Sequence, residues 1–319
     1  MVNSWYDYFM EALFKKYPKR LQLAHALMDL LFIEREAAYR RLRRDVMFPI
    51  NEIIKISQVW NISLDEIIGV NSSQVSFQMR QVNYLNPSTE ELKYLKDVIQ
   101  TIDNLKKHPN TEFMCICNKL PRNLLAGYKH LNQFYLFKWM YQYGNEQVII
   151  PFSKIIASEE KGQLDQAYYQ AIKQVPNTSF IWDNRIFEYL VSNIKYFHSI
   201  RMITDQEKDL IKEDLNALLS YMLLIANNGC YPETKNKVNL YISQLSVDTN
   251  YSYTFSPETK ICFVHVFEKY DIYTLNVEMV HRFKIWMQQK KRSSIQITEV
   301  DERSRMEFFT KQQQVIDNL

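Results

Sequence analysis

Residues 20–69 read RLQLAHALMDLLFIEREAAYRRLRRDVMFPINEIIKISQVWNISLDEIIG, and this stretch decides the expected fold of the first part of the chain. Apolar residues recur at helical spacing in it and in the segment before it, over 5–14, 21–32, 37–46, 50–60 and 64–68. Pro49 stands where a new helix would begin, a position that tolerates proline. Gly69 can end the last helix. The pattern therefore predicts a compact bundle of five helices over residues 1–70.

Charge is distributed unevenly over this predicted bundle. Residues 15–44 hold nine Lys or Arg against three acidic residues, a net charge of +6, whereas residues 45–70 carry −3. The whole 319-residue chain carries only +3, so a surface for nucleic acid has to be a local patch. DNA binding depends largely on neutralising phosphates, and one basic side suits that purpose.

The segment 34–46, EREAAYRRLRRDV, predicts a helix with its arginines on one face. At about 100° per residue, Ala38 and Leu42 lie along one stripe of a helix, whereas Arg40 and Arg44 lie nearly opposite. One face can then pack on a neighbouring helix while the other presents guanidinium groups. A guanidinium fork can pair with the edge of guanine or with phosphate. The segment thus has the character of a DNA-reading helix.

The end of the opening stretch carries a family resemblance. The pattern P-x-x-x-x-x-x-I-x-x-x-x-x-I-S-L-D-E-I-I-G, from Pro49 to Gly69, resembles the fourth and fifth helices of the Cro/lambda-repressor type of helix-turn-helix domain. The resemblance implies that residues 21–31 form the first helix of the motif. It also implies that residues 34–44 form the recognition helix, which enters the major groove.

A wider similarity joins the two ends of the chain. The run A-x-Y-R-R-L-R-R, residues 37–44, together with R-x-x-F-F-x-x-Q, residues 305–312, is similar to a group of bacterial regulators of about this length.

The turn of the motif departs from the helix-turn-helix family, because residues 30–33 read Leu-Leu-Phe-Ile where a small residue, often glycine, is usual. We therefore expect the first helix of the motif to run longer.

The candidate DNA-contacting residues belong to the start of the first motif helix and to the recognition helix. They are Lys19, Arg20, Arg35, Glu36, Tyr39, Arg40, Arg43 and Arg44. Lys19 and Arg20, near a helix start, are placed to hold phosphate. Tyr39 has two open interpretations, as a groove residue or as a packing residue at the shoulder of the helix.

The rest of the chain is expected to be mainly α with an α+β C-terminal part. Residues 71–88 are polar and turn-rich and predict a linker. Residues 89–319 predict a regulatory or dimerisation domain with three parts: a helical part 89–230, a β-containing part 236–300 and a C-terminal helix 301–317. The helical part also contains a brief β-rich run, EFMCIC at 112–117. Alternating segments at 238–246, 249–255 and 260–268 predict a small antiparallel meander. Thr204 and Glu207 form a capping pattern that starts a long helix.

Composition excludes several function classes. The five glycines are dispersed, whereas a P-loop or a dinucleotide fingerprint needs them clustered. Four cysteines with one C-x-C spacing are neither a disulfide framework nor a good zinc site, and the six histidines lie far apart. We expect no metal, no cofactor and no catalytic residues.

The N-terminus lacks the pattern of a signal peptide, and the longest apolar run, 217–226, is about half a membrane span. We therefore expect a cytoplasmic protein without membrane contact.

These observations favour a sequence-specific transcriptional regulator that binds double-stranded DNA. A homodimer is expected because one such module buries little DNA surface, whereas a two-fold dimer reads two half-sites. The C-terminal part would dimerise, sense an unidentified effector or contact a partner. The alternatives are a protein-interaction module whose basic helix docks an acidic partner, and an enzyme whose site is scattered over the C-terminal part.

Overall fold

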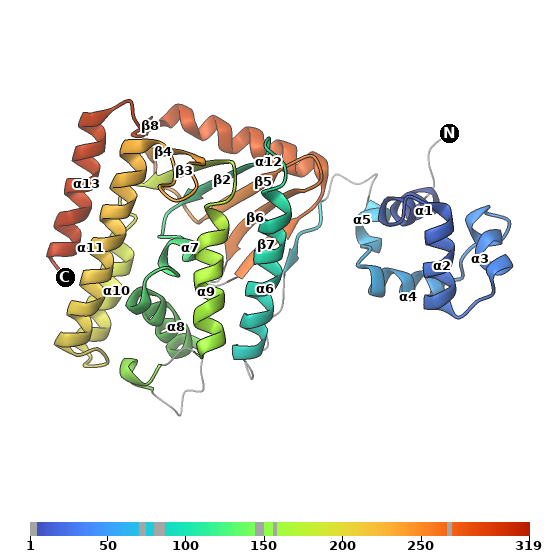
Figure 1. Ribbon diagram of the computed structural model, residues 1–319, viewed down its shortest axis with the longest axis horizontal. Coiled ribbons are helices and arrows are strands. Elements are labelled where there is room, and N and C mark those ends of the chain that lie inside the picture. Colours follow the sequence, from blue (N-terminus) through green and yellow to red (C-terminus); the bar gives the residue numbers. More distant parts are fainter. Residues whose placement is uncertain (1–4, 70–74, 80–86, 144–149, 156–157, 267–269) are drawn as a thin grey trace. The chain divides into compact units, whose positions relative to one another are not determined.

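The computed structural model describes residues 5–69, 75–79, 87–143, 150–155, 158–266 and 270–319. The chain forms two compact units, Met1–Ser76 and Phe77–Leu319 (Figure 1). The first unit is helical. The second combines helices with a mixed β-sheet, so the chain as a whole mixes α and β structure.

The N-terminal unit contains five helices among its described residues: α1 (Trp5–Lys16), α2 (Arg20–Leu31), α3 (Arg35–Leu42), α4 (Ile50–Trp60) and α5 (Leu64–Gly69). Each lies where the apolar periodicity predicts a helix. Their apolar stripes meet in one core, in which Phe9, Leu13 and Leu27 are fully buried. Ala38 of α3 and Ile56 of α4 are equally buried. A small residue at 38 lets α3 approach its neighbours closely.

The turn between α2 and α3 is sharper than the sequence suggests. The helix α2 ends at Leu31 and Phe32 takes the left-handed conformation, with φ 55° and ψ 45°, so the expected longer helix is wrong. In a continuous helix, Leu31 and Ile33 would point about 200° apart. The reversal at Phe32 lets both pack on the core. The Phe32 side chain is left 86% exposed.

The helix α3 is shorter than the expected span 34–44. It ends at Leu42 because Arg44 turns left-handed, with φ 68°. The amide of Arg44 donates to the carbonyl of Arg41 at 3.0 Å, and that of Asp45 donates to the carbonyl of Arg40 at 2.9 Å, which is the Schellman pattern of helix termination. The reversal brings Phe48 into the core, where only 3% of it is exposed.

The described strands of the C-terminal unit form an eight-stranded sheet in the order β1-β7-β6-β5-β2-β3-β4-β8. The strands are β1 (Gln78–Met79), β2 (Glu112–Cys117), β3 (Asn177–Asp183), β4 (Lys237–Ser243), β5 (Tyr251–Phe255), β6 (Lys260–Val266), β7 (Tyr270–Thr274) and β8 (Ser294–Gln296). The pairs β2–β3 and β3–β4 are parallel, and the remaining pairs are antiparallel.

The expectation of a small antiparallel sheet within residues 236–300 is therefore wrong. The meander β5-β6-β7 exists, but its outer strands pair with β2 and β1. Two central strands, β2 and β3, come from the part expected to be mostly helical. The β-rich run 112–117 forms β2 as the sequence predicts, whereas β3 is not predicted. Strand β3 is buried along most of its length, so it lacks the polar alternation by which a strand is recognised in a sequence.

Helices cover both faces of this sheet. The helices are α6 (Pro87–Leu105), α7 (Arg122–Leu125), α8 (Lys129–Tyr143), α9 (Glu159–Ile172), α10 (Glu188–Ser199), α11 (Asp205–Asn228), α12 (Val277–Lys290) and α13 (Glu302–Asp317). The crossovers β2–β3 and β3–β4 advance in one direction through the sheet, and right-handed crossovers then place their helices on the same face. Among the described helices, α12 crosses the sheet on the other face (Figure 1). The Thr204–Glu207 capping box is formed at the start of α11.

The terminal helix α13 begins one residue later than expected and packs on the larger core. Phe308, Phe309 and Ile316 are buried there. Arg305 donates to the carbonyl of Ile297 at 3.0 Å, and Gln312 donates to the carbonyl of Asn184 at 2.9 Å. The R-x-x-F-F-x-x-Q residues therefore act in packing.

Candidate nucleic-acid interface

The candidate residues sit on or beside α2 and α3. Lys19 is the residue before α2 and Arg20 opens that helix, and no side chain caps the first amides of α2. Arg35 opens α3, and Arg40 lies in its last turn. All four side chains are exposed. Free amides at a helix start beside two cations suit a phosphate.

Three arginines at the end of α3 are engaged within the chain. Arg41 makes a two-armed pair with Glu52 of α4, with both nitrogen–oxygen distances 2.7 Å and both side chains 15% exposed. Planar pairing of this kind fixes the angle between two helices. Arg41 is thus a structural arginine that ties α3 to α4.

Arg43 and Arg44, which the sequence places among the candidates, lie just beyond α3 and also have partners. Arg43 contacts Glu36 at 2.9 Å and Asp45 at 2.8 Å, and these hydrogen bonds raise the pKa of its guanidinium above the ordinary value. Arg44 contacts Asp7 of α1 at 2.5 Å. Both arginines remain about half exposed, so their pairs are weak in water.

Seven exposed cations of this unit form no ion pair within the described part of the chain. They are Lys15, Lys16, Lys19, Arg20, Arg35, Arg40 and Lys55. The first four lie at the end of α1 and the start of α2, Arg35 and Arg40 lie on α3, and Lys55 lies on α4. Lys15 and Lys16 are not among the candidates predicted from the sequence. Their signal was their place in the last turn of α1, next to Lys19 and Arg20.

Tyr39 and Glu36 take different positions on α3. The Tyr39 ring is half-buried against the core, and the guanidinium of Arg35 lies 5.7 Å from its centre. Tyr39 therefore packs at the shoulder of the helix, and its ring also orients Arg35. Glu36 is exposed and holds Arg43, which places a carboxylate on the same surface as the cations.

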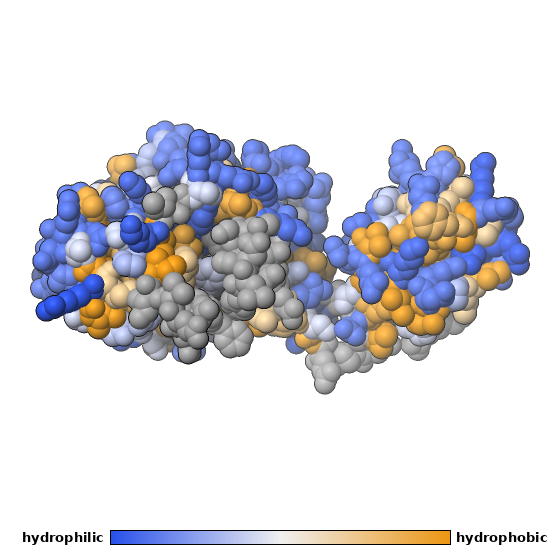
Figure 2. All heavy atoms as spheres, turned by 90° about the horizontal axis from the view of Figure 1, so that it is seen from below, coloured by the Kyte–Doolittle hydropathy of each residue, from blue (hydrophilic) through white to orange (hydrophobic). Residues whose placement is uncertain are grey.

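Apolar side chains also reach the surface of this unit (Figure 2). Phe32, Met47 and Ile50 are 86%, 66% and 66% exposed. The ammonium of Lys55 lies 4.9 Å from the centre of the Phe32 ring.

The rest of the described chain offers no comparable chemistry for a metal or a disulfide. Among the described residues, no three His, Cys, Asp or Glu side chains come close enough to hold a metal ion. Cys115 and Cys117 lie on one face of β2 with their sulfurs 3.1 Å apart, both as buried thiols. Burial raises the pKa of the Cys117 thiol well above its ordinary value, which makes it a poor nucleophile. Within the described ranges, no helix has the length and apolar character needed to cross a bilayer.

Comparison with known proteins adds no relative. A scan against families of known proteins, a search of curated proteins and a search of solved structures each find no match.

Proposed function

We propose that the chain is a sequence-specific DNA-binding transcriptional regulator of the Cro/lambda-repressor helix-turn-helix type, acting in the bacterial cytoplasm, with α3 in the major groove. One observation carries the proposal. All but one of the exposed cations without carboxylate partners in the described part of the N-terminal unit lie at the end of α1, at the start of α2 or on α3, the exception being Lys55 of α4, whereas the acids engage Arg41, Arg43 and Arg44. Unpaired arginines and lysines on a small helical unit suit a polyanion.

The proposal divides the candidate residues by role. Arg35 and Arg40 read base edges, because they project from α3 and are held by no acid in the described chain. Lys19 and Arg20 hold phosphate beside the uncapped start of α2. Arg43 and Arg44 close the end of α3, and would contact phosphate by exchanging their acidic partners for it. No catalytic residue and no cofactor belong to this function.

Salt dependence tests this function directly. Full-length protein should enrich a short motif from a random duplex DNA pool. Its affinity for that motif should fall by about 10³-fold or more between 50 and 200 mM salt, as for proteins that make six to ten phosphate contacts. Lys19→Ala should weaken binding to all sequences alike and reduce the salt slope by about one. Binding that selects no motif and ignores salt would contradict the proposal.

The alternative function, docking of an acidic protein by the basic surface, makes a different prediction in the same assay. No DNA motif is then enriched, and duplex DNA merely competes with an acidic polypeptide. The DNA-binding function predicts tighter binding to the selected duplex than to polyglutamate. The protein-docking function predicts the reverse order of affinities.

We also propose that the protein is a homodimer, because a two-fold pair reads two half-sites. The outer strands of the meander do not support a dimer, because β2 and β1 pair with them. Support comes instead from an apolar row, Met79, Ile272, Val264 and Tyr251, whose members are register partners across β1, β7, β6 and β5. Partners in antiparallel register point to the same face, so the row is continuous. It ends beside the aromatic residues Phe283 and Trp286 of α12.

Sedimentation tests the dimer. Full-length protein should be dimeric at micromolar concentration, and Met79→Glu should shift it toward monomer, because Met79 is a 46% exposed member of the row. Met306→Glu on α13 is the matched control, since that methionine is 49% exposed and lies outside the row. Monomeric wild-type protein, or equal effects of the two variants, would remove this surface from the proposal.

A further inference from the structure

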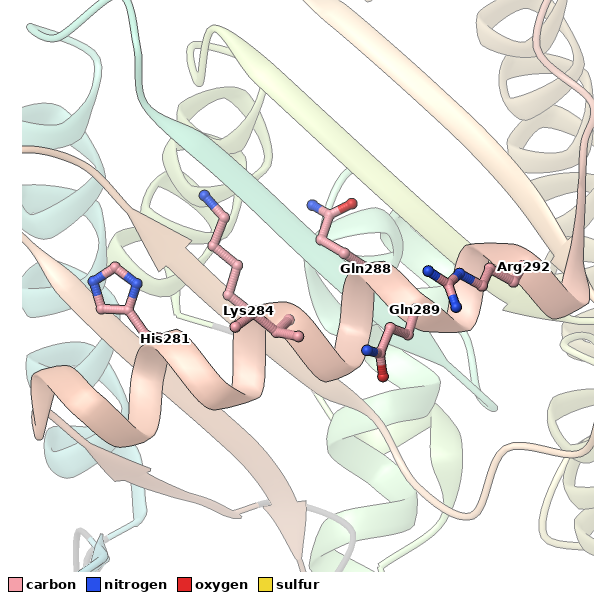
Figure 3. A pocket seen from close by; sticks show the side chains of 6 residues that line it. His281, Lys284, Gln288, Gln289 and Arg292 are labelled. Atoms are coloured by element: carbon pink, nitrogen blue, oxygen red, sulfur yellow. The ribbon is translucent and has the colours of Figure 1, made fainter.

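An open groove runs along one flank of α12 in the C-terminal unit. It is a shallow hollow, open to solvent, with room for about 360 Å³, and it is lined by His281, Lys284, Ile285, Gln288, Gln289 and Arg292. Figure 3 shows five of these side chains, two of them amides and three of them basic, following one another along the helix. They recur three or four positions apart, which is the spacing that places side chains on one face.

Positive charge exceeds negative charge beside this groove. The carboxylate of Glu112, at the start of β2, pairs with the ammonium of Lys284. Lys291 lies in the field of the same carboxylate and also in that of Lys237. Burial lowers the pKa of Lys291, the charge of Glu112 opposes this, and the positive charge of Lys237 adds to the lowering. Lys284 and Lys291 thus share one carboxylate, and like charges held close together are stabilised by an anion.

The floor of the groove is held in place by contacts to the sheet. The ammonium of Lys284 lies 4.1 Å from the centre of the Phe255 ring. Gln288 donates to the hydroxyl of Tyr253 at 2.7 Å, and that hydroxyl donates to Glu112 at 3.2 Å. The positions of Lys284 and Gln288 are therefore fixed before any ligand arrives, and preorganisation of this kind lowers the entropic cost of binding.

The rim is free to contact a ligand. His281, Gln289 and Arg292 are exposed, and they have no hydrogen-bond or ion-pair partner within the described part of the chain. The His281 ring meets the Phe255 ring edge to face at 5.0 Å, which holds the imidazole beside the groove. The rim thus offers a guanidinium, an imidazole and an amide next to the fixed ammonium.

We propose that this groove binds a phosphorylated small molecule of mononucleotide size. Arg292 and Lys284 would hold the phosphate, since guanidinium and ammonium groups are its usual partners in proteins. The amides of Gln288 and Gln289 each carry donors and an acceptor, so they can read a hydrogen-bonding group next to the phosphate. The open space of about 360 Å³ can hold a ligand of this size at the surface. The site goes beyond the proposed DNA binding and does not depend on it.

The test compares two arginine variants of the full-length protein by calorimetric titration. The probes are inorganic phosphate, AMP and GMP. Wild-type protein should bind at least one nucleotide with a dissociation constant below about 1 mM and more tightly than phosphate. Arg292→Glu should weaken that binding by about tenfold or more, because it reverses the charge at the rim. Arg282→Glu is the control for a charge reversal on the same helix, since Arg282 is exposed, pairs with Glu278 and lines a different hollow.

The possible results separate the explanations. A nucleotide that binds wild type and Arg282→Glu but not Arg292→Glu supports the site. Absence of binding to every probe overturns it, and so does an equal loss in both variants, which would indicate general surface charge. If Arg292→Glu weakens duplex DNA binding while no nucleotide binds, the groove belongs to the DNA interface and the small-molecule site is wrong. Failure of the helix-turn-helix function leaves these titrations unaffected.

Discussion

Replacing both Arg35 and Arg40 by alanine is expected to weaken binding to the selected DNA motif by ~4 kcal/mol, or about 10³-fold. Each is an exposed arginine of α3 without a carboxylate partner in the described chain, so each can form a two-armed contact with a base. Such a contact contributes about 1–3 kcal/mol of discrimination. Binding to unrelated duplexes should fall less, because the phosphate-binding lysines remain. Fluorescence anisotropy with the motif and a scrambled duplex measures both effects.

Arg43→Ala is the matched control for this variant. Arg43 lies next to the same helix but is engaged by Glu36 and Asp45, so its removal should change motif affinity much less than that of Arg40. The thermal unfolding midpoint should also change little, because both ion pairs are exposed. A double variant that loses affinity equally for motif and scrambled DNA would reassign Arg35 and Arg40 to phosphate.

Glu233→Gln is expected to lower the free energy of unfolding by about 2–3 kcal/mol. Lys173 is 1% exposed, and its ammonium contacts Glu233 at 2.7 Å. The same ammonium lies 3.7 Å from the ring centre of Tyr169 and 4.8 Å from that of Tyr221, whose hydroxyl donates to Glu233 at 2.9 Å. Removing one partner of a buried pair strands the other charge, which costs about 3–5 kcal/mol when both are buried. We take a lower figure because the Glu233 side chain is 41% exposed.

A second substitution separates the stranded charge from a packing defect. Lys173→Met combined with Glu233→Gln should recover most of the lost stability, because it replaces the uncompensated ammonium by an apolar chain of similar length. Urea unfolding of the wild type and of the single and double variants measures the recovery. A double variant less stable than Glu233→Gln would show that the ammonium between the two rings stabilises the fold even without the carboxylate.

The pH dependence of stability should change with the same residue. Burial raises the pKa of Glu233, but hydrogen bonds from Lys173 and Tyr221 outweigh it and hold the pKa below its ordinary value. A depressed carboxyl pKa stabilises the folded state fully above the unfolded value of about 4.3, and this stabilisation is lost as pH falls through the folded pKa. The wild type should lose stability below about pH 4.5 by this route. Glu233→Gln should lack that part of the acid loss.

Local patterns in the sequence are sufficient for much of the secondary structure. The five N-terminal helices follow from apolar residues at 3.6-residue spacing, and the Thr204–Glu207 box starts α11 because its hydrogen bonds join residues three apart. The terminal helix after Asp301 follows in the same way, with Asp301 accepting from the amide of Ser304. Such interactions close within one helical turn, so neighbouring residues alone specify them.

At the candidate site, local sequence does not show which arginines have acidic partners. The sequence identifies a basic segment, and it places Arg40, Arg43 and Arg44 in it on equal terms. The structure separates them. Tertiary contact brings Asp7 of α1 to Arg44 across 37 positions, Arg43 is held by Glu36 and Asp45 from nearby in the chain, and Arg40 has no acidic partner in the described chain. The pairing of Arg44 depends on which helices meet, and a count of charges along the sequence does not contain that information.

In the sheet, too, some strands are recognisable from local sequence, whereas their pairing depends on distant segments. The meander β5-β6-β7 has half-exposed strands whose alternation is visible in the sequence, whereas β3, buried along most of its length, reads as a short apolar run. Only tertiary structure pairs β3 with β2 and β4, whose partner residues lie about 60 positions away in the chain. The sequence by itself determined the helices and the basic segment, because their periods are local. Strand order and the choice of free arginines depend on contacts that form only when distant segments bury their apolar faces together.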